Sequence, residues 1–218
     1  MQEGRFAIAP WSCARGMFES SALCAWLFEI GIGPSERVSR SLSLRYAALR
    51  EQQKIARYDG DTKKIDKIEK RIDSIEHTAV KLGYKLLRDK KNRRIGIGQI
   101  KPNITALVQY QFSGEKLYRV LSGMAHSNYT TLKSLAFTKP AYKNGNGAVI
   151  QRAVPPARQL SLLSVVGKIY AKCLWLKTIQ FGFDAFNMAI LLEEFYDTLR
   201  IDDTNENRFW RTIIKKIS

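Results

Sequence analysis

Two side chains in the segment LYRVLSGMAHSNYTTLK (117–133) could perform chemistry together: Arg119 and His126, with six residues between them. Positions seven apart on an α-helix differ by only about 20° around its axis, so the pair shares one face. Imidazole can move protons near neutral pH, and a guanidinium can stabilise a crowded phosphate through its forked donors. RNA carries its own nucleophile, the 2′-hydroxyl. The pair therefore points to cleavage of RNA without a metal ion.

The rest of this segment suits an amphipathic helix. The apolar residues fall on the face that would pack into a bundle: Leu117, Val120, Leu121, Met124 and Ala125. Ser122 lies between the arginine and the histidine, and the polar side continues with Asn128, Tyr129, Thr130 and Lys133. Two alternatives remain open. The histidine could be buried and hydrogen-bonded across helices, to Glu19 through Arg15 or Arg119, or the face could bind a ligand without catalysis.

The Arg119–His126 spacing on a basic helical chain resembles the Arg-x4-6-His motif of the HEPN superfamily. Its members are helical bundles, and many are metal-independent ribonucleases of toxin–antitoxin, abortive-infection and CRISPR systems. They commonly form homodimers in which two motifs make one cleft. The segments ARGMFESSALCAWLFE and YRVLSGMAH also resemble uncharacterised bacterial helical proteins with an early R-x-x-x-E helix and a later YR-x-L-S-x-x-x-H helix. The resemblance implies that Arg119 and His126 are the active pair, with Arg15, Glu19 and Ser122 as neighbours.

The charge of the chain favours a polyanionic partner such as RNA. The formal net charge is +16 and the sequence pI is about 9.9. Cations crowd into one segment with a single acid, Asp89, and the glycines that follow predict a loop. Such a basic loop commonly holds phosphates without reading sequence, and a solvated linker is the alternative. The predicted nucleic-acid contacts are Lys85, Arg88, Lys90, Lys91, Arg93 and Arg94.

The spacing of apolar residues predicts an all-α fold: a helical bundle, with one domain over 1–218 and a projecting antiparallel helical hairpin over 35–82. Ser35 and Asp61 are the expected N-caps of the two arms. The second arm carries a strict apolar seam with charged residues between its members: Ile65, Ile68, Ile72, Ile75, Ala79 and Leu82. This hairpin is a candidate surface for a protein partner.

Helices are also expected from Pro10 to about Ile30, after Asn103, and after Ser113. The segment 138–158 is rich in Pro, Gly and Asn and predicts a long loop. One long apolar helix, or two joined near Gly182, should cover 159–200. Asp202 or Asp203 would cap a final short helix.

Several classes of site and location are not indicated. The three cysteines lack the spacing of metal ligands, so neither a metal nor another cofactor is expected. No apolar run reaches the ~20 residues that a bilayer requires, so no membrane span is expected. The cysteines are expected to be reduced thiols within helices of a cytoplasmic protein. The short lead-in before the first helix would fit the remnant of a longer N-terminus. Two functions follow: a HEPN-like endoribonuclease of a toxin or phage-defence type, or a non-enzymatic helical scaffold that binds nucleic acid or protein.

Overall fold

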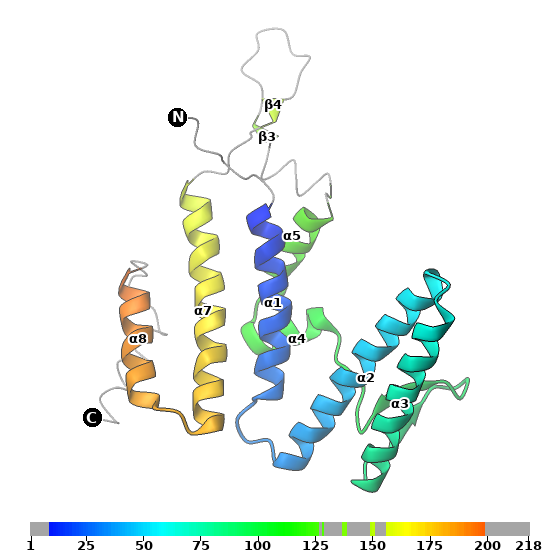
Figure 1. Ribbon diagram of the computed structural model, residues 1–218. Coiled ribbons are helices and arrows are strands. Elements are labelled where there is room, and N and C mark those ends of the chain that lie inside the picture. The colour runs from blue at the N-terminus through cyan, green and yellow to red at the C-terminus, as the bar shows by residue number, and fades with distance from the viewer. Residues whose placement is uncertain (1–8, 127, 129–136, 139–148, 151–155, 199–218) are drawn as a thin grey trace. The chain divides into compact units, whose positions relative to one another are not determined.

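Figure 1 shows the computed structural model, which describes residues 9–126, 128, 137–138, 149–150 and 156–198. These residues form an all-α fold with only two short strand pairs, which confirms the predicted class. The chain divides into two compact units. Unit 1 comprises Met1–Phe28 and Ile104–Ser218, and unit 2 comprises Glu29–Asn103. Unit 2 is thus inserted after the first helix of unit 1, where the sequence predicted one domain over 1–218.

Unit 1 is organised around α1 (Ala9–Leu27), which packs against α4 (Ile104–Phe112), α5 (Glu115–Ala125) and α7 (Pro156–Phe181). Figure 1 shows α1 and α7 side by side, with α8 (Ala185–Thr198) against α7. The buried face of α1 recurs every three or four residues and includes three alanines, so neighbouring helices can approach closely. Its buried apolar residues are Trp11, Ala14, Phe18, Ala22, Ala25 and Trp26. The predicted first helix is therefore confirmed and ends at Leu27.

The apolar C-terminal region forms two helices, the second of the two predicted arrangements. α7 ends at Phe181 because Gly182 adopts φ +66°, and the Phe183 N–H then donates to the Thr178 carbonyl at 3.0 Å. Of the predicted loop 138–158, Thr138 lies in β3 (Phe137–Thr138), which pairs antiparallel with β4 (Val149–Ile150). Residues 156–158 begin α7, and the rest of that loop lies outside the described residues, as does the predicted final helix.

Unit 2 contains α2 (Pro34–Tyr58) and α3 (Thr62–Lys81), which pack against each other over the region where the helical hairpin was predicted. Figure 1 shows that the two helices run antiparallel. The apolar seam of α3 faces Tyr46, Leu49 and Ala56 of α2, and Ile72 is fully buried. The seam ends at Ala79, one member earlier than predicted, because Leu82 follows α3 and is exposed.

One of the two predicted helix caps is confirmed. The Asp61 carboxylate accepts a hydrogen bond from the Lys64 N–H at 2.9 Å, which satisfies a free donor at the start of α3. The prediction for Ser35 was wrong, since α2 begins at Pro34 and Gly33 is the N-cap residue. Proline lacks an N–H and suits the first helical position, so the cap lies one residue before it. The Ser35 hydroxyl instead lies 3.2 Å from the Tyr84 hydroxyl.

The basic segment predicted as a loop is a β-hairpin, which corrects that prediction. β1 (Leu86–Arg88) pairs antiparallel with β2 (Arg94–Ile97), with a bulge after Leu87. Ile97 is fully buried in the core that α2 and α3 share. At the turn, the Asp89 carboxylate accepts hydrogen bonds from the backbone N–H groups of Lys91 and Arg93. Burial of a few apolar residues and this turn order the segment despite its charge.

The hairpin approaches α2 at Gly98. This residue has φ +66°, and its N–H donates to the Lys85 carbonyl at 2.8 Å. A Cβ atom at this position would lie 2.2 Å from the Ser39 hydroxyl oxygen. Glycine is therefore required twice over, by the left-handed backbone and by the contact with α2.

Candidate functional site

A polar cluster in unit 1 joins α1 to the end of α5. An Arg15 Nη1 donor lies 2.7 Å from Nε2 of His126, although 111 positions separate the two residues. The Arg15 Nε group donates to the Glu19 carboxylate at 2.9 Å, and the Tyr118 hydroxyl donates to the same oxygen at 2.8 Å. The two segments that carry the resemblance, R-x-x-x-E and YR-x-L-S-x-x-x-H, therefore meet in the folded chain.

The core packing of the two helices explains this meeting. Phe18 of α1 and Leu121 of α5 are almost fully buried, so the polar residues beside them lie at the edge of the contact between the helices. Arg15 and Glu19 are one turn apart on α1 and form an i,i+4 ion pair. Tyr118 keeps its ring buried and directs its hydroxyl to Glu19. The cluster is thus held by apolar packing on one side and remains reachable from solvent on the other.

The ionisation of the cluster follows from these contacts. Burial, followed by the hydrogen bond to Glu19, raises the pKa of Tyr118, so its hydroxyl stays a donor at neutral pH. Burial opposes the charge on Arg15, but the bonds to Glu19 and Tyr118 outweigh it and raise the pKa of Arg15. Arginine has donors only, so a hydrogen bond between Arg15 and Nε2 of His126 requires a neutral imidazole with its proton on Nδ1.

His126 itself stands at the end of α5, not within a longer helix. α5 ends at Ala125, and His126 is its C-cap residue, with φ −97° and ψ 13°. The Asn128 N–H donates to the Gly123 carbonyl at 2.7 Å, which is the bond that commonly closes a helix C-terminus. The side chain of His126 is exposed, so the predicted alternative of a buried histidine is wrong. Its tie to Glu19 through Arg15 is present.

Arg119, the predicted partner of His126, lies elsewhere on α5. Its guanidinium is 69% exposed and forms an ion pair with Glu115 at 2.6 Å, one turn earlier on the same helix. The arginine in contact with the imidazole is Arg15. Ser122 is half-buried between the two predicted residues, and Asn128 is exposed. Tyr129, predicted as a supporting residue, lies outside the described residues, as do Thr130 and Lys133.

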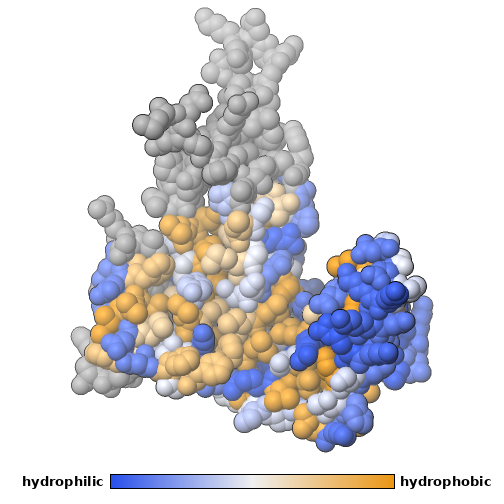
Figure 2. Space-filling view, in the orientation of Figure 1, coloured by the Kyte–Doolittle hydropathy of each residue, from blue (hydrophilic) through white to orange (hydrophobic). Residues whose placement is uncertain are grey.

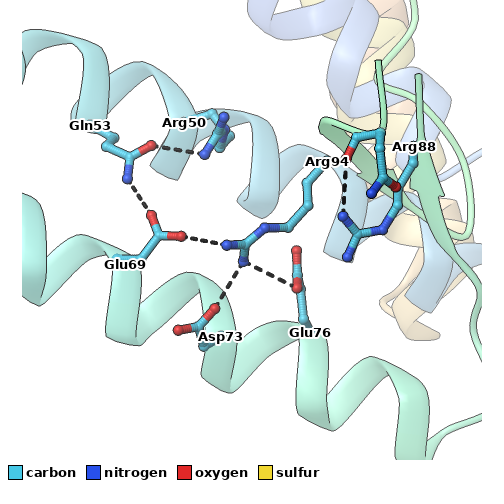
Figure 3. A network of polar contacts seen from close by, with 8 residues as sticks. Arg50, Gln53, Glu69, Asp73, Glu76, Arg88 and Arg94 are labelled. Atoms are coloured by element: carbon cyan, nitrogen blue, oxygen red, sulfur yellow. Dashed lines mark hydrogen bonds and ion pairs between the residues drawn. The ribbon is translucent and has the colours of Figure 1, made fainter. Parts of the chain in front are cut away.

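The predicted nucleic-acid contacts of unit 2 separate into two kinds. Lys85, Arg88, Lys90, Lys91 and Arg93 are exposed on the hairpin. Arg94 is different, because it points back to α3 and bonds to three carboxylates: Glu69 at 2.7 Å, Asp73 at 2.8 Å and Glu76 at 3.3 Å. Figure 3 shows its guanidinium among these side chains. Arg94 therefore anchors the hairpin to α3 and is not a free cation.

This network continues into α2 through a residue that the sequence analysis did not single out. Gln53 is only 2% exposed. Its amide donates to the Glu69 carboxylate, and its carbonyl oxygen accepts from Arg50 at 2.8 Å. Figure 3 shows the resulting chain of contacts from α2 to α3. The available signal was a polar residue at an apolar position of the helical repeat, four after buried Leu49 and three before buried Ala56.

Charge is concentrated in unit 2. It contains 19 Lys and Arg against 10 Asp and Glu, a net charge of +9 from a total of +16. Figure 2 shows hydrophilic side chains over most of the visible face of unit 2, whereas unit 1 exposes many hydrophobic ones. Such an excess attracts anions over a distance and is screened by salt.

Two cysteine thiols also meet inside unit 1. The hydrogen bond from Cys173 of α7 lowers the pKa of Cys24 on α1 to about 7, with burial opposing this and Lys177 adding to it. The same bond and then burial raise the pKa of Cys173, which also contacts the Ser21 carbonyl at 3.3 Å. All three cysteines are free thiols, and Cys24 is the partly exposed member of this pair.

Within the described part of the chain, no three His, Cys, Asp or Glu side chains gather as metal ligands would. The helices described here also include none with the length and apolar character to cross a membrane. Comparison of the chain with protein-family models, with curated proteins and with solved structures finds no match.

Proposed function

We propose that the protein is a HEPN-like, metal-independent endoribonuclease whose centre is His126 together with Arg15. The observation that carries this proposal is the exposed imidazole held against a guanidinium, with Glu19 and Tyr118 fixing that guanidinium from behind. The supporting shell reduces the freedom of the arginine, as a site that must position a phosphate requires. A role in a toxin or phage-defence system belongs to the same proposal.

The contacts suggest how the reaction would proceed. A phosphate of RNA offers Arg15 a stronger acceptor than a neutral imidazole, so binding would draw this donor away from Nε2 of His126. The freed nitrogen can then take the proton of the adjacent 2′-hydroxyl. The 2′-oxygen attacks phosphorus, the bond to the 5′-oxygen breaks, and the leaving 5′-oxygen takes the proton that His126 has just accepted, directly or through a water molecule. The products are a 2′,3′-cyclic phosphate and a 5′-hydroxyl.

Arg119 has a different part in this proposal from the one first expected. It is exposed and, among the residues that the structure describes, it is paired with Glu115 one turn away, so it can exchange that partner for a phosphate further along the strand. Its loss should weaken RNA binding more than it slows the chemical step. Loss of Arg15 should slow the chemical step more than it weakens RNA binding. The homodimer implied by the resemblance stays a prediction.

The test is cleavage of total cellular RNA by the purified full chain in EDTA. His126→Ala should slow cleavage by ~100-fold or more, which is typical for loss of a general base. Arg15→Ala should act similarly, and Arg119→Ala should cost less than ~10-fold at saturating RNA. His77→Ala is the matched control, because His77 is exposed on α3 in unit 2.

Two results would count against the proposal. Wild-type protein that leaves all RNA intact is not this enzyme, and cleavage that survives His126→Ala comes from another site or a contaminant. An oligonucleotide with 2′-deoxyribose at the cleaved position supplies a further check. It must resist cleavage, because the proposed reaction has no other nucleophile.

A second candidate is a non-enzymatic nucleic-acid-binding module, and the net charge of +9 on unit 2 favours it. In that case wild type and His126→Ala would both leave RNA intact yet bind it equally. Binding would weaken steeply with added salt, since contacts to phosphates release counterions. Replacing Lys90 and Lys91 at the exposed hairpin turn by glutamine should reduce both the affinity and its salt dependence.

A further inference from the structure

A pocket in unit 2 lies outside the site of the proposed ribonuclease. Its volume is about 410 Å³, within the range of small-ligand sites. The lining comes from three elements: Arg50 and Arg57 of α2, Ile65 and Glu69 of α3, and residues of the β-hairpin. All of these lie in Glu29–Asn103, so the pocket is complete within one unit.

The lining is strongly cationic. Five arginines contribute to it, namely Arg50, Arg57, Arg88, Arg93 and Arg94, against the two carboxylates Asp66 and Glu69. Arg94 and Glu69 already neutralise each other at 2.7 Å, and Arg93 is paired with Asp89 beside the pocket at 2.6 Å. Of the four arginines other than Arg94, three therefore have no ion pair among the described residues, against one remaining carboxylate in the lining. Charges of one sign gathered in a concave site attract a ligand that carries several charges of the other sign.

These four arginines keep most of their donors available. A guanidinium has five N–H donors. Arg50 uses one on the Gln53 carbonyl oxygen, and Arg88 uses one on the Asn92 carbonyl oxygen at 3.1 Å. The Nε and Nη2 groups of Arg93 contact Asp89. In unit 2, which the structure describes in full, the Arg57 side chain has no hydrogen bond or ion pair.

We propose that this pocket binds a compact phosphate chain, such as inorganic tripolyphosphate or the triphosphate of a nucleotide. Guanidinium forks match phosphate oxygens in pairs, and a compact chain brings several negative charges into one small volume. A nucleic-acid strand separates its single charges by sugars, so fewer of them fit the pocket at once. Ile65 is the one apolar side chain of the lining, and it offers no ring on which a base could stack.

The network behind the pocket supports preorganisation. Gln53 is buried and bonded to both Arg50 and Glu69, while Arg94 fastens the hairpin to α3. Figure 3 shows Arg50, Gln53 and Glu69 linked across the two helices, with Arg88 on the neighbouring strand. The backbone that presents Arg57 and Arg88 is therefore fixed before a ligand arrives, which lowers the entropic cost of binding.

The inference goes beyond the ribonuclease proposal and does not depend on it. The test is isothermal titration calorimetry of the full chain with tripolyphosphate, pyrophosphate, ATP and a single-stranded RNA oligonucleotide. Arg57→Gln and Arg88→Gln should each weaken tripolyphosphate binding by ~10-fold, the effect of losing a charge-assisted hydrogen bond. Arg45→Gln is the matched control, because Arg45 is exposed on α2 and does not line the pocket.

Each outcome decides the proposal. The proposal is supported if tripolyphosphate binds more tightly than pyrophosphate. This binding must weaken in Arg57→Gln and Arg88→Gln and stay unchanged in Arg45→Gln. Tighter binding of ATP than of tripolyphosphate would show that the natural ligand is a nucleotide triphosphate. Equal binding of the two would show that the pocket recognises the phosphate groups alone. An equal loss with Arg45→Gln would mean diffuse charge and overturn the site. RNA binding that depends on the pocket arginines while tripolyphosphate does not bind would also overturn it. Circular dichroism of each variant excludes misfolding.

Discussion

The strongest single expectation concerns Arg94, the residue that holds the hairpin on α3. Arg94→Met keeps most of the apolar stem and removes all donors to Glu69, Asp73 and Glu76, which lie 2.7, 2.8 and 3.3 Å away. The three carboxylates would then lose the cation at their centre. The loss of one partner from a buried pair leaves a charge that is neither solvated nor neutralised.

The exposure of each carboxylate sets the magnitude. Glu76 is only 12% exposed, so it approaches the buried case, for which removing a partner costs about 3–5 kcal/mol. Asp73 is 60% exposed and contributes at most about 1 kcal/mol. Arg94 is itself 28% exposed, and partial solvation reduces the whole effect. We expect unit 2 to lose about 2–3 kcal/mol of its free energy of unfolding.

Urea unfolding with two probes measures this change in the full chain. All four tryptophans lie in unit 1, at positions 11, 26, 175 and 210, so their fluorescence reports on that unit. Far-ultraviolet circular dichroism reports on the helices of both units. Arg94→Met should lower the urea midpoint of the part of the dichroism transition that belongs to unit 2. The midpoint measured by tryptophan fluorescence, which reports on unit 1, should stay unchanged.

Two further variants make the test specific. Arg93→Met is the matched control, because the Arg93 guanidinium is 70% exposed and pairs only within the hairpin turn. It should change the free energy of unfolding by less than about 0.5 kcal/mol. Adding Glu76→Gln to Arg94→Met should restore part of the loss, since the least solvated charge is gone. A loss below about 0.5 kcal/mol for Arg94→Met would refute the reasoning.

Two other expectations concern the core and the thiols. Ile72→Ala should destabilise unit 2 by about 2–4 kcal/mol in urea, because it opens a cavity at a fully buried position, whereas exposed Val80→Ala should cost less than about 0.5 kcal/mol. Alkylation of Cys24 by iodoacetamide should rise to a plateau above pH 7, because the pKa of Cys24 is about 7 and the thiolate is the nucleophile. Cys173→Ala removes the hydrogen bond that lowers this pKa, so the midpoint should move to higher pH; an unchanged midpoint would contradict the assigned cause.

Periodicity explains which elements the sequence predicted well. The isoleucines of α3 recur by three and four with charged residues between them, so one strong pattern specified both the helix and its buried face. Asp61 was identifiable as a cap because it directly precedes that pattern. By contrast, Arg93 and Arg94 are adjacent and chemically identical, yet one is exposed and the other bonds to three carboxylates. Only the register of the hairpin distinguishes them.

The candidate site shows where the limit of local reasoning lies. His126 was found from its own helix, and Arg15 and Glu19 were singled out by resemblance, but the spacing rule paired His126 with Arg119. That rule assumes a continuous helix, and α5 ends one residue before the histidine. The contact between Arg15 and His126 depends on how α1 packs against α5, which no spacing within either helix encodes.

The contact of the hairpin with α2 at Gly98 makes the position of the hairpin independent of the charge on its turn. On that side the close approach requires the lack of a side chain at Gly98, a steric limit that does not respond to salt or pH. Gln99 adds hydrogen bonds to Glu36 and Ser39 of α2. The contacts at this position are with Ser39, Tyr84 and Glu36, and none of them involves the exposed cations near the turn. Substitutions of these exposed cations can therefore change which anions unit 2 attracts without disturbing the contact at Gly98. The ligand preference of this unit can thus change faster in evolution than its fold.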